Sequence, residues 1–207
     1  MATDLDIANL ALDQIGGGEV TSITADTSSA GKRVARYFPM ALVASLEKFD
    51  WSFASTRSSA INATGSAPKS GFEHKFPVPP GCVKLREVMD DDGAAISLWV
   101  EESGYILCND DGPIYVRFTE ELDSIVDLPL AFAEAVAYRL AAFLAPPHTS
   151  NPGLRQAMLA EWARCLSEAM LTDGKRRAQP MQPAVGTTAT ADPNDVVYVP
   201  DSIAARE

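Results

Sequence analysis

The stretch FDWSFASTR, residues 49–57, marks a change from helix to strand. Before it, apolar residues recur at three- and four-residue steps that end at Phe49, which is helical spacing. After Asp50 the pattern alternates, and alternation would place Phe49, Trp51 and Phe53 on one face of an extended segment. We therefore predict that these three residues, called the aromatic joint below, are buried where a helix ends and a strand begins.

Two helices are predicted before the aromatic joint, over residues 4–15 and 29–50. Thr3 followed by Asp6 has the pattern of a capping box, although in its weaker form with aspartate, and marks the start of the first helix. Pro39 lies within the apolar stripe of the second helix. Because proline removes a backbone donor and its ring crowds the preceding turn, we expect a kink or a break there.

Residues 51–126 are predicted to form a small antiparallel β region. Asp111 followed by Gly112 is a typical hairpin signal, so we expect it to join the last two strands directly. Strands are expected over residues 96–100, 105–108 and 114–119, after an extended proline-containing segment at 76–81 and a short strand or helical turn around 83–88.

The helical pattern returns over residues 129–145 and 151–174. Pro146 is expected to end the first of these helices, and Asn151 followed by Pro152 is typical of a helix start. The predicted fold class is therefore α+β and mainly α, with a four-helix bundle from residues 1–50 and 127–175, an antiparallel β insertion at 51–126 between helices two and three, and an extended C-terminal arm at 176–207.

The predicted arm is poor in large apolar residues except for Val196, Val197, Tyr198 and Val199. Such a segment cannot bury enough apolar surface to fold alone, but it can become ordered against a partner. We interpret the four residues as a strand added to a sheet edge or laid in a groove of another protein. The alternative is a frayed tail without a partner.

The net charge of −11 is concentrated in one stretch. Residues 90–127 contain eleven acidic residues and one arginine, Arg117, for a net charge of −10. Because phosphate neutralisation by basic residues supplies most nucleic-acid affinity, stable binding to nucleic acid is excluded. The stretch is either a solvated face, a surface that faces DNA without holding it, or one that meets a basic partner. Its predicted acidic face comprises Asp90, Asp91, Asp92, Glu101, Glu102, Asp110 and Asp111.

Nothing in the sequence marks a catalytic or metal site. The three cysteines are far apart and lack CxxC spacing, which argues against disulfides and zinc and suits a reducing cytoplasm. His74 and His148 stand alone, and no Ser or Cys has the context of a nucleophile. No apolar run approaches the ~20 residues that span a bilayer, and the N-terminus lacks the pattern of a signal peptide. We predict a protein without enzymatic activity, metal, cofactor or membrane partner.

Together these segments resemble the head-to-tail adaptor family of tailed bacteriophages, of the tail tubular protein A kind. The resemblance covers about residues 4–175. Its most specific part is TSSAGKRVARYFPMALVASLEKFDWSFASTR, a Tyr-x-Pro helix that ends in Trp-x-Phe-Ala with a later Arg. The other parts are DIANLALDQIGGGEVTSI, FPVPPGCVKL, IYVRFTEEL and LPLAFAEAVAYRLAAFLAPPHTSNPGLRQAMLAEWARCLSEA.

The resemblance implies a structural virion protein of the tail or neck, made in the host cytoplasm, that assembles into a ring, typically a dodecamer. Its expected partners are copies of itself, the portal protein, and the tail tube or nozzle protein, with DNA passing through without stable binding. The arm residues 196–199 would bind the portal or a neighbouring subunit.

Two alternatives stay open at this point. Some adaptors of this family have been credited with peptidoglycan cleavage, which would require two carboxylates flanking the glycosidic bond, and no pair of acids here has an identifiable motif. The chain could also be a non-viral cytoplasmic helical module that scaffolds or binds other proteins.

Overall fold

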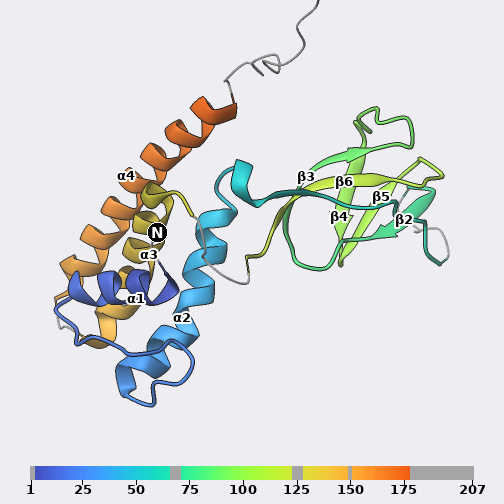
Figure 1. Ribbon diagram of the computed structural model, residues 1–207. Helices are drawn as coiled ribbons and strands as arrows, with labels where there is room; N and C mark the ends of the chain where they lie inside the picture. Colours follow the sequence, from blue (N-terminus) through green and yellow to red (C-terminus); the bar gives the residue numbers. More distant parts are fainter. Residues whose placement is uncertain (1–2, 66–70, 123–127, 149–150, 178–207) are drawn as a thin grey trace, which may run out of the picture. The chain divides into compact units, whose positions relative to one another are not determined.

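The computed structural model describes residues 3–65, 71–122, 128–148 and 151–177 (Figure 1). The chain divides into a compact unit of residues 1–177 and a second unit of residues 178–207. The second unit lies outside the described residues, and with it Val196, Val197, Tyr198 and Val199 of the predicted arm.

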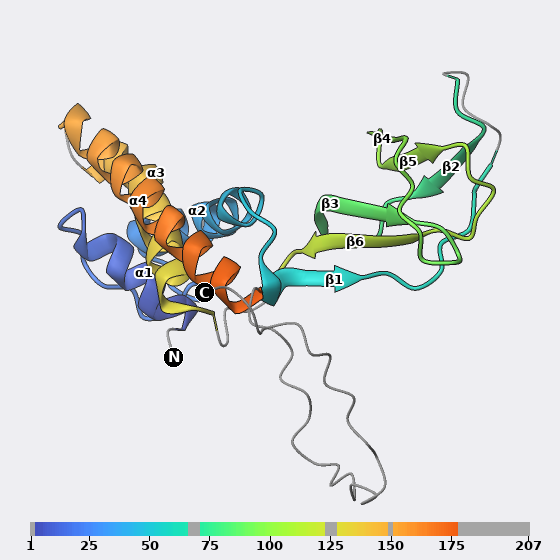
Figure 2. The ribbon, with the colours of Figure 1, turned by 90° about the horizontal axis from the view of Figure 1, so that it is seen from above.

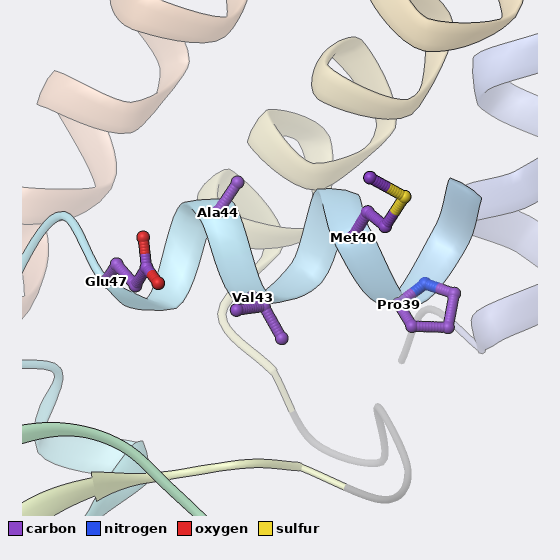
Figure 3. Close-up of a pocket in the computed structure, with 5 residues that line it drawn as sticks. All are labelled: Pro39, Met40, Val43, Ala44 and Glu47. Carbon is purple, nitrogen blue, oxygen red and sulfur yellow. The ribbon is translucent and has the colours of Figure 1, made fainter. Parts of the chain in front are cut away.

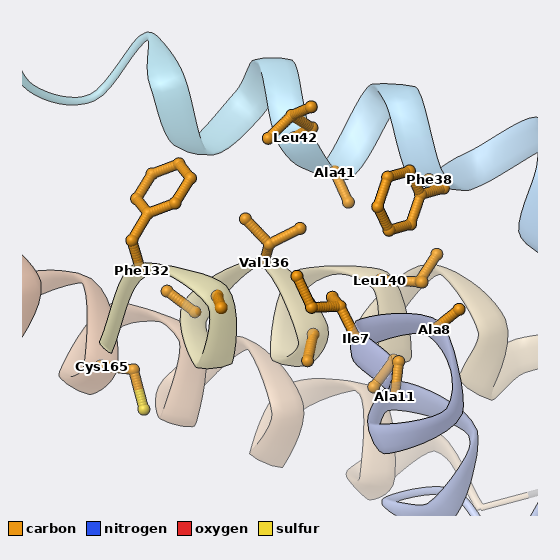
Figure 4. Packing of buried hydrophobic residues seen from close by; sticks show 14 of the residues in the cluster. Ile7, Ala8, Ala11, Phe38, Ala41, Leu42, Phe132, Val136, Leu140 and Cys165 are labelled. Carbon is orange, nitrogen blue, oxygen red and sulfur yellow. The ribbon is translucent and has the colours of Figure 1, made fainter. Parts of the chain in front are cut away.

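One helix lies at the centre of the helical part. The other three pack mainly on α3 rather than on one another, and Figure 4 shows side chains of α1 and α2 directed onto it. Alanines at positions 133, 135, 137, 141, 142 and 145 make α3 narrow, and all six are buried, so neighbouring helices can approach closely. The described helices are α1 (Asp4–Asp13), α2 (Ser29–Leu46), α3 (Leu130–His148) and α4 (Pro152–Arg177).

Local capping defines the helix starts. Thr3 Oγ1 accepts from the Asp6 backbone N–H at 3.2 Å, and Asp6 Oδ2 accepts from the Thr3 N–H at 2.8 Å, which completes the predicted capping box. Ser28 Oγ accepts from the Gly31 N–H at 3.0 Å at the start of α2. Asn151 Oδ1 accepts from the Gly153 N–H at 2.9 Å before α4.

The helix ends differ from the predictions. The α2 helix continues through Pro39 without a break and stops at Leu46, four residues before the expected end. Beyond the helix end, the carbonyl oxygens of Leu46 and Phe49 accept hydrogen bonds from the Arg86 guanidinium of the β region instead of from helical N–H groups. The later helices are longer than expected, since α3 extends to His148 and α4 to Arg177.

The predicted four-helix bundle with a single antiparallel insertion is wrong. The six described strands form two antiparallel sheets of three strands each, with the orders β1-β6-β3 and β2-β5-β4 (Figure 2). Inner side chains of both sheets, such as Phe76, Val116 and Ile106, share a second hydrophobic core, and two sheets can enclose such a core where one cannot. The strands are β1 (Ser55–Arg57), β2 (His74–Pro77), β3 (Cys82–Met89), β4 (Trp99–Glu102), β5 (Tyr105–Cys108) and β6 (Tyr115–Glu120).

The predicted hairpin at Asp111-Gly112 is also wrong, because β5 and β6 belong to different sheets. The segment crosses between the sheets, and a Cβ atom on Gly112 would come within 2.8 Å of the Phe76 ring. A tight hairpin instead joins β4 to β5 through Ser103 and Gly104, which have φ values of 52° and 80°. Positive φ at both central residues is typical of a two-residue type I′ turn.

Candidate interaction surfaces

The aromatic joint lies at the boundary between α2 and the β region. The predicted burial is confirmed for Trp51, which is fully buried, whereas Phe49 and Phe53 are half-buried. The Trp51 ring centroid lies 5.1 Å from that of Phe49 and 5.5 Å from that of Phe53. Phe132 of α3 packs edge-on against Trp51 at 4.8 Å. The chain therefore leaves the helical part at Trp51 and returns to it at Phe132, and both residues belong to the same group of packed aromatic rings.

The backbone at the joint is not the extended strand that alternation indicated. Residues Ser52–Ala54 form a short 3₁₀ turn (η1), and the strand begins only at Ser55. The turn is held by Asp173 of α4, which is 2% exposed and accepts hydrogen bonds from both the N–H and the hydroxyl of Ser52, the N–H at 2.9 Å. A carboxylate from the last turns of α4 thus shapes this segment, which no local pattern revealed.

A buried serine connects the joint to α4. The Trp51 indole N–H donates to the Ser45 carbonyl at 3.2 Å, and the Trp162 indole N–H donates to Ser45 Oγ at the same distance. The Ser45 hydroxyl itself donates to the Ala41 carbonyl at 2.9 Å. These polar atoms are therefore satisfied inside the core, as buried groups usually are.

A network of charges surrounds Asp50, directly before Trp51. Arg117 donates to Asp50 at 2.6 Å and to Glu87 at 3.1 Å. Arg86 lies 3.9 Å from Asp50 and donates to Thr119 Oγ1 at 2.9 Å. The hydrogen bond to Asp50 raises the pKa of Arg117 above its usual value. This network binds the end of α2 to β3 and β6. No local pattern reveals this network, because Arg86 and Arg117 are 36 and 67 positions from Asp50 in the sequence.

The seven predicted acidic residues lie on three turns of the β region. Asp90, Asp91 and Asp92 follow the end of β3, where Asp91 accepts from the Tyr115 hydroxyl at 3.2 Å. Glu101 and Glu102 end β4 at its hairpin with β5, whereas Asp110 and Asp111 follow the opposite end of β5. Five of the seven are exposed, and Asp90 and Asp110 are half-buried.

The described cysteines are poorly suited to nucleophilic chemistry. All three are free. Burial raises the pKa of Cys82 to about 11, and the charge of Glu101 raises it further. Burial also raises the pKa values of Cys108 and Cys165. Because the thiolate is the reactive form, these thiols stay largely protonated near neutral pH.

No metal-binding cluster of His, Cys, Asp or Glu is present among the described residues. Within the same residues, no helix has both the length and the apolar character needed to cross a bilayer.

An open apolar groove runs along the solvent side of α2 (Figure 3). It is lined by Pro39, Met40, Val43 and Ala44, with Glu47 at one end. Met40 is 52% exposed. A groove of this kind suits contact with another protein better than a small polar substrate.

Comparison with protein-family models and with curated protein sequences finds no match for this chain.

Proposed function

We propose that this protein is a ring-forming head-to-tail adaptor of a tailed bacteriophage, which joins the portal to the tail tube and forms part of the DNA channel. The observation that carries the proposal is the aromatic joint. The most specific part of the resemblance ends in Trp-x-Phe-Ala, and in this chain Trp51 of that motif is fully buried against Phe49, Phe53 and Phe132.

The joint supports the proposal because it gives the motif a physical role. The β region leaves the helical part at Trp51 and the chain returns to it at Phe132, and both residues lie in the same core. The Tyr-x-Pro part of the motif lies in α2, where Tyr37 stacks on Phe143 at 5.6 Å and Pro39 lines the exposed groove. The motif thus combines a core function with a surface available to partners.

The charge distribution supports a channel that does not hold DNA. The chain carries a net charge of −11, and a negative surface repels a duplex instead of releasing its counterions. DNA would then slide past the ring. An enzyme is disfavoured because burial raises the pKa values of the described thiols and no motif marks a catalytic carboxylate pair.

A mass measurement tests the proposal directly. The purified full chain is analysed by native mass spectrometry and negative-stain microscopy, alone and mixed with a purified portal ring. Closed rings, and co-sedimentation with the portal, are expected. An unrelated acidic protein of similar mass is the control for non-specific binding to the portal. A chain that stays monomeric at high concentration and ignores the portal would favour a helical scaffolding module instead.

A further inference from the structure

A second group of aromatic residues surrounds an arginine between α2, α3 and α4. The Arg139 guanidinium carbon lies 4.8 Å from the Phe143 ring centroid and 4.4 Å from that of Trp162. Tyr37 of α2 stacks on the Phe143 ring. Rings from two helices therefore hold the Arg139 guanidinium, as cation–π contacts do. We call Tyr37, Arg139, Phe143 and Trp162 the arginine cluster, and Arg155 of α4 lies near enough for its charge to affect the pKa of Arg139.

The charge of Arg139 is not neutralised within the described residues. Its Nε atom is buried and has no hydrogen-bond acceptor there. Burial lowers the pKa of Arg139, and the nearby positive charge of Arg155 lowers it further. In the described part of the chain, ion pairs involve Arg86, Arg117 and Arg164 but neither Arg139 nor Arg155.

Lys48 also brings a positive charge to the Trp162 ring. Lys48 Nζ is 5.9 Å from the Trp162 ring centroid. Lys48, which follows α2, and Arg139 of α3 thus both lie beside the Trp162 ring in a chain that is strongly acidic overall. Desolvating a charge without a counter-ion is costly. A carboxylate that bound here would therefore contribute more binding free energy than one paired with a fully exposed arginine.

The ligand chemistry follows from the geometry. A guanidinium held between rings offers its remaining N–H groups in a fixed plane, which matches the two oxygens of a carboxylate or phosphate. A nucleic-acid strand would bring many phosphates toward a chain with a net charge of −11, which opposes its binding. A protein carboxylate brings only one or two charges and is favoured.

The same chain supplies suitable carboxylates on its exposed turns. Asp91 and Asp92 follow β3, and Glu101 and Glu102 lie at the β4–β5 hairpin, all four exposed to solvent. We propose that Arg139 and Arg155 of one copy bind carboxylates from one of these acidic turns of a second copy, while Phe143 and Trp162 hold the guanidinium in place. This contact rests on the proposed function for the premise that the chain self-associates.

Self-association of the full chain tests the proposal. Analytical ultracentrifugation would compare the wild type with Arg155→Gln, which changes an exposed side chain, and with the double variant Arg139→Gln/Arg155→Gln. The matched control is Arg164→Gln, on the same helix but already paired with Glu161 and Glu168. We expect the double variant to associate about tenfold or more weakly, Arg155→Gln to associate measurably more weakly, and the control to match the wild type.

Charge reversal identifies the turn that supplies the carboxylates. Arg155→Glu is expected to weaken association, and it is combined in one chain either with Asp91→Lys/Asp92→Lys or with Glu101→Lys/Glu102→Lys. We expect one combination to restore association. If neither does, the carboxylates do not come from these turns and the proposal is overturned.

The outcomes separate this contact from the ring itself. A wild type that never self-associates overturns both. If the wild type forms rings, and Arg155→Gln and the double variant form them equally well, only this contact is overturned. Duplex DNA bound by the wild type and not by the double variant would assign the arginines to phosphate instead, and would also overturn it.

Discussion

The molecule contains two clusters that combine aromatic rings with arginines, and they are completed in different ways. At the aromatic joint, Arg117 and Arg86 lie against Asp50, and Glu87 and Thr119 accept further hydrogen bonds. In the arginine cluster, the described residues provide rings but no carboxylate for Arg139 or Arg155. The first cluster is complete within one chain and stabilises the fold. Among the described residues the second contains no anion paired with Arg139 or Arg155, and the proposed contact would supply one from a second copy.

This difference predicts that the Asp50 network affects the stability of the fold, whereas the arginine cluster affects association between molecules. A charge network closed inside one chain contributes to the free energy of unfolding, and partly buried pairs are little screened by salt. An unpaired guanidinium contributes little to folding but can dominate an interface. Substitutions in the two clusters should therefore affect different measurements, and four variants test this in order of expected effect on stability.

The largest effect is expected for Trp51→Ala. The side chain is fully buried and packs against three other rings, so its removal should lower the free energy of unfolding by about 3–5 kcal/mol. Urea denaturation followed by circular dichroism measures this loss. A loss below about 1 kcal/mol would mean that the joint is not part of the core.

The second largest effect is expected for Asp50→Asn. It removes the carboxylate shared by Arg86 and Arg117, whose side chains are only 12% and 21% exposed. Leaving these charges poorly paired should cost about 2–3 kcal/mol. The control is Glu161→Gln, which breaks an exposed pair with Arg164 and should cost no more than about 0.5 kcal/mol. Equal losses for both variants would show that the Asp50 network adds no stability of its own.

A smaller effect is expected for Trp162→Phe, which links the two clusters. The variant keeps an aromatic ring beside Arg139 but loses the indole hydrogen bond to Ser45 Oγ. The expected loss is about 1 kcal/mol in thermal or urea unfolding. Trp99→Phe is a comparison in the β region, because no hydrogen bond of its indole is found among the described residues. A larger loss for Trp99→Phe would contradict the importance of the Ser45 contact.

The smallest effect on stability is expected for Arg139→Gln. The lost cation–π contacts are offset by removing a buried Nε that lacks an acceptor, so the free energy of unfolding should fall by less than about 1 kcal/mol. Urea denaturation of the variant, at a concentration where the wild type is monomeric, measures this change. A loss above about 2 kcal/mol would make Arg139 a structural residue and remove the contrast between the clusters.

Features set by neighbouring residues could be predicted from the sequence. The capping box of Thr3 and Asp6, the start of α4 at Asn151-Pro152 and the strand at Tyr105–Cys108 depend on residues within one turn or one strand. The aromatic cluster at residues 49–53 was also visible, because its helical spacing ends abruptly at Phe49. Its 3₁₀ turn was not, because Asp173 lies 121 positions away.

Pairings between distant segments could not be predicted in this way. Asp111-Gly112 has a good local hairpin pattern, yet β5 pairs with β2 and β4 while β6 pairs with β1 and β3. Strand pairing depends on which apolar faces can be buried together, and the shared core around Phe76 and Val116 requires two sheets. Likewise, Glu101 and Glu102 are close in sequence to Asp110 and Asp111, yet the antiparallel course of β4 and β5 places the two pairs at opposite ends of β5.

Local sequence therefore specifies where most helices begin, the burial of Trp51, and the overall acidity of the chain. The partners of each strand, the charge network of Asp50 and the contacts of Arg139 with the Phe143 and Trp162 rings depend on the folded arrangement. The physical reason is the range of the interactions: caps and turns are formed by residues a few positions apart, whereas sheets, cores and ion pairs join residues whose separation along the chain carries no signal of their contact.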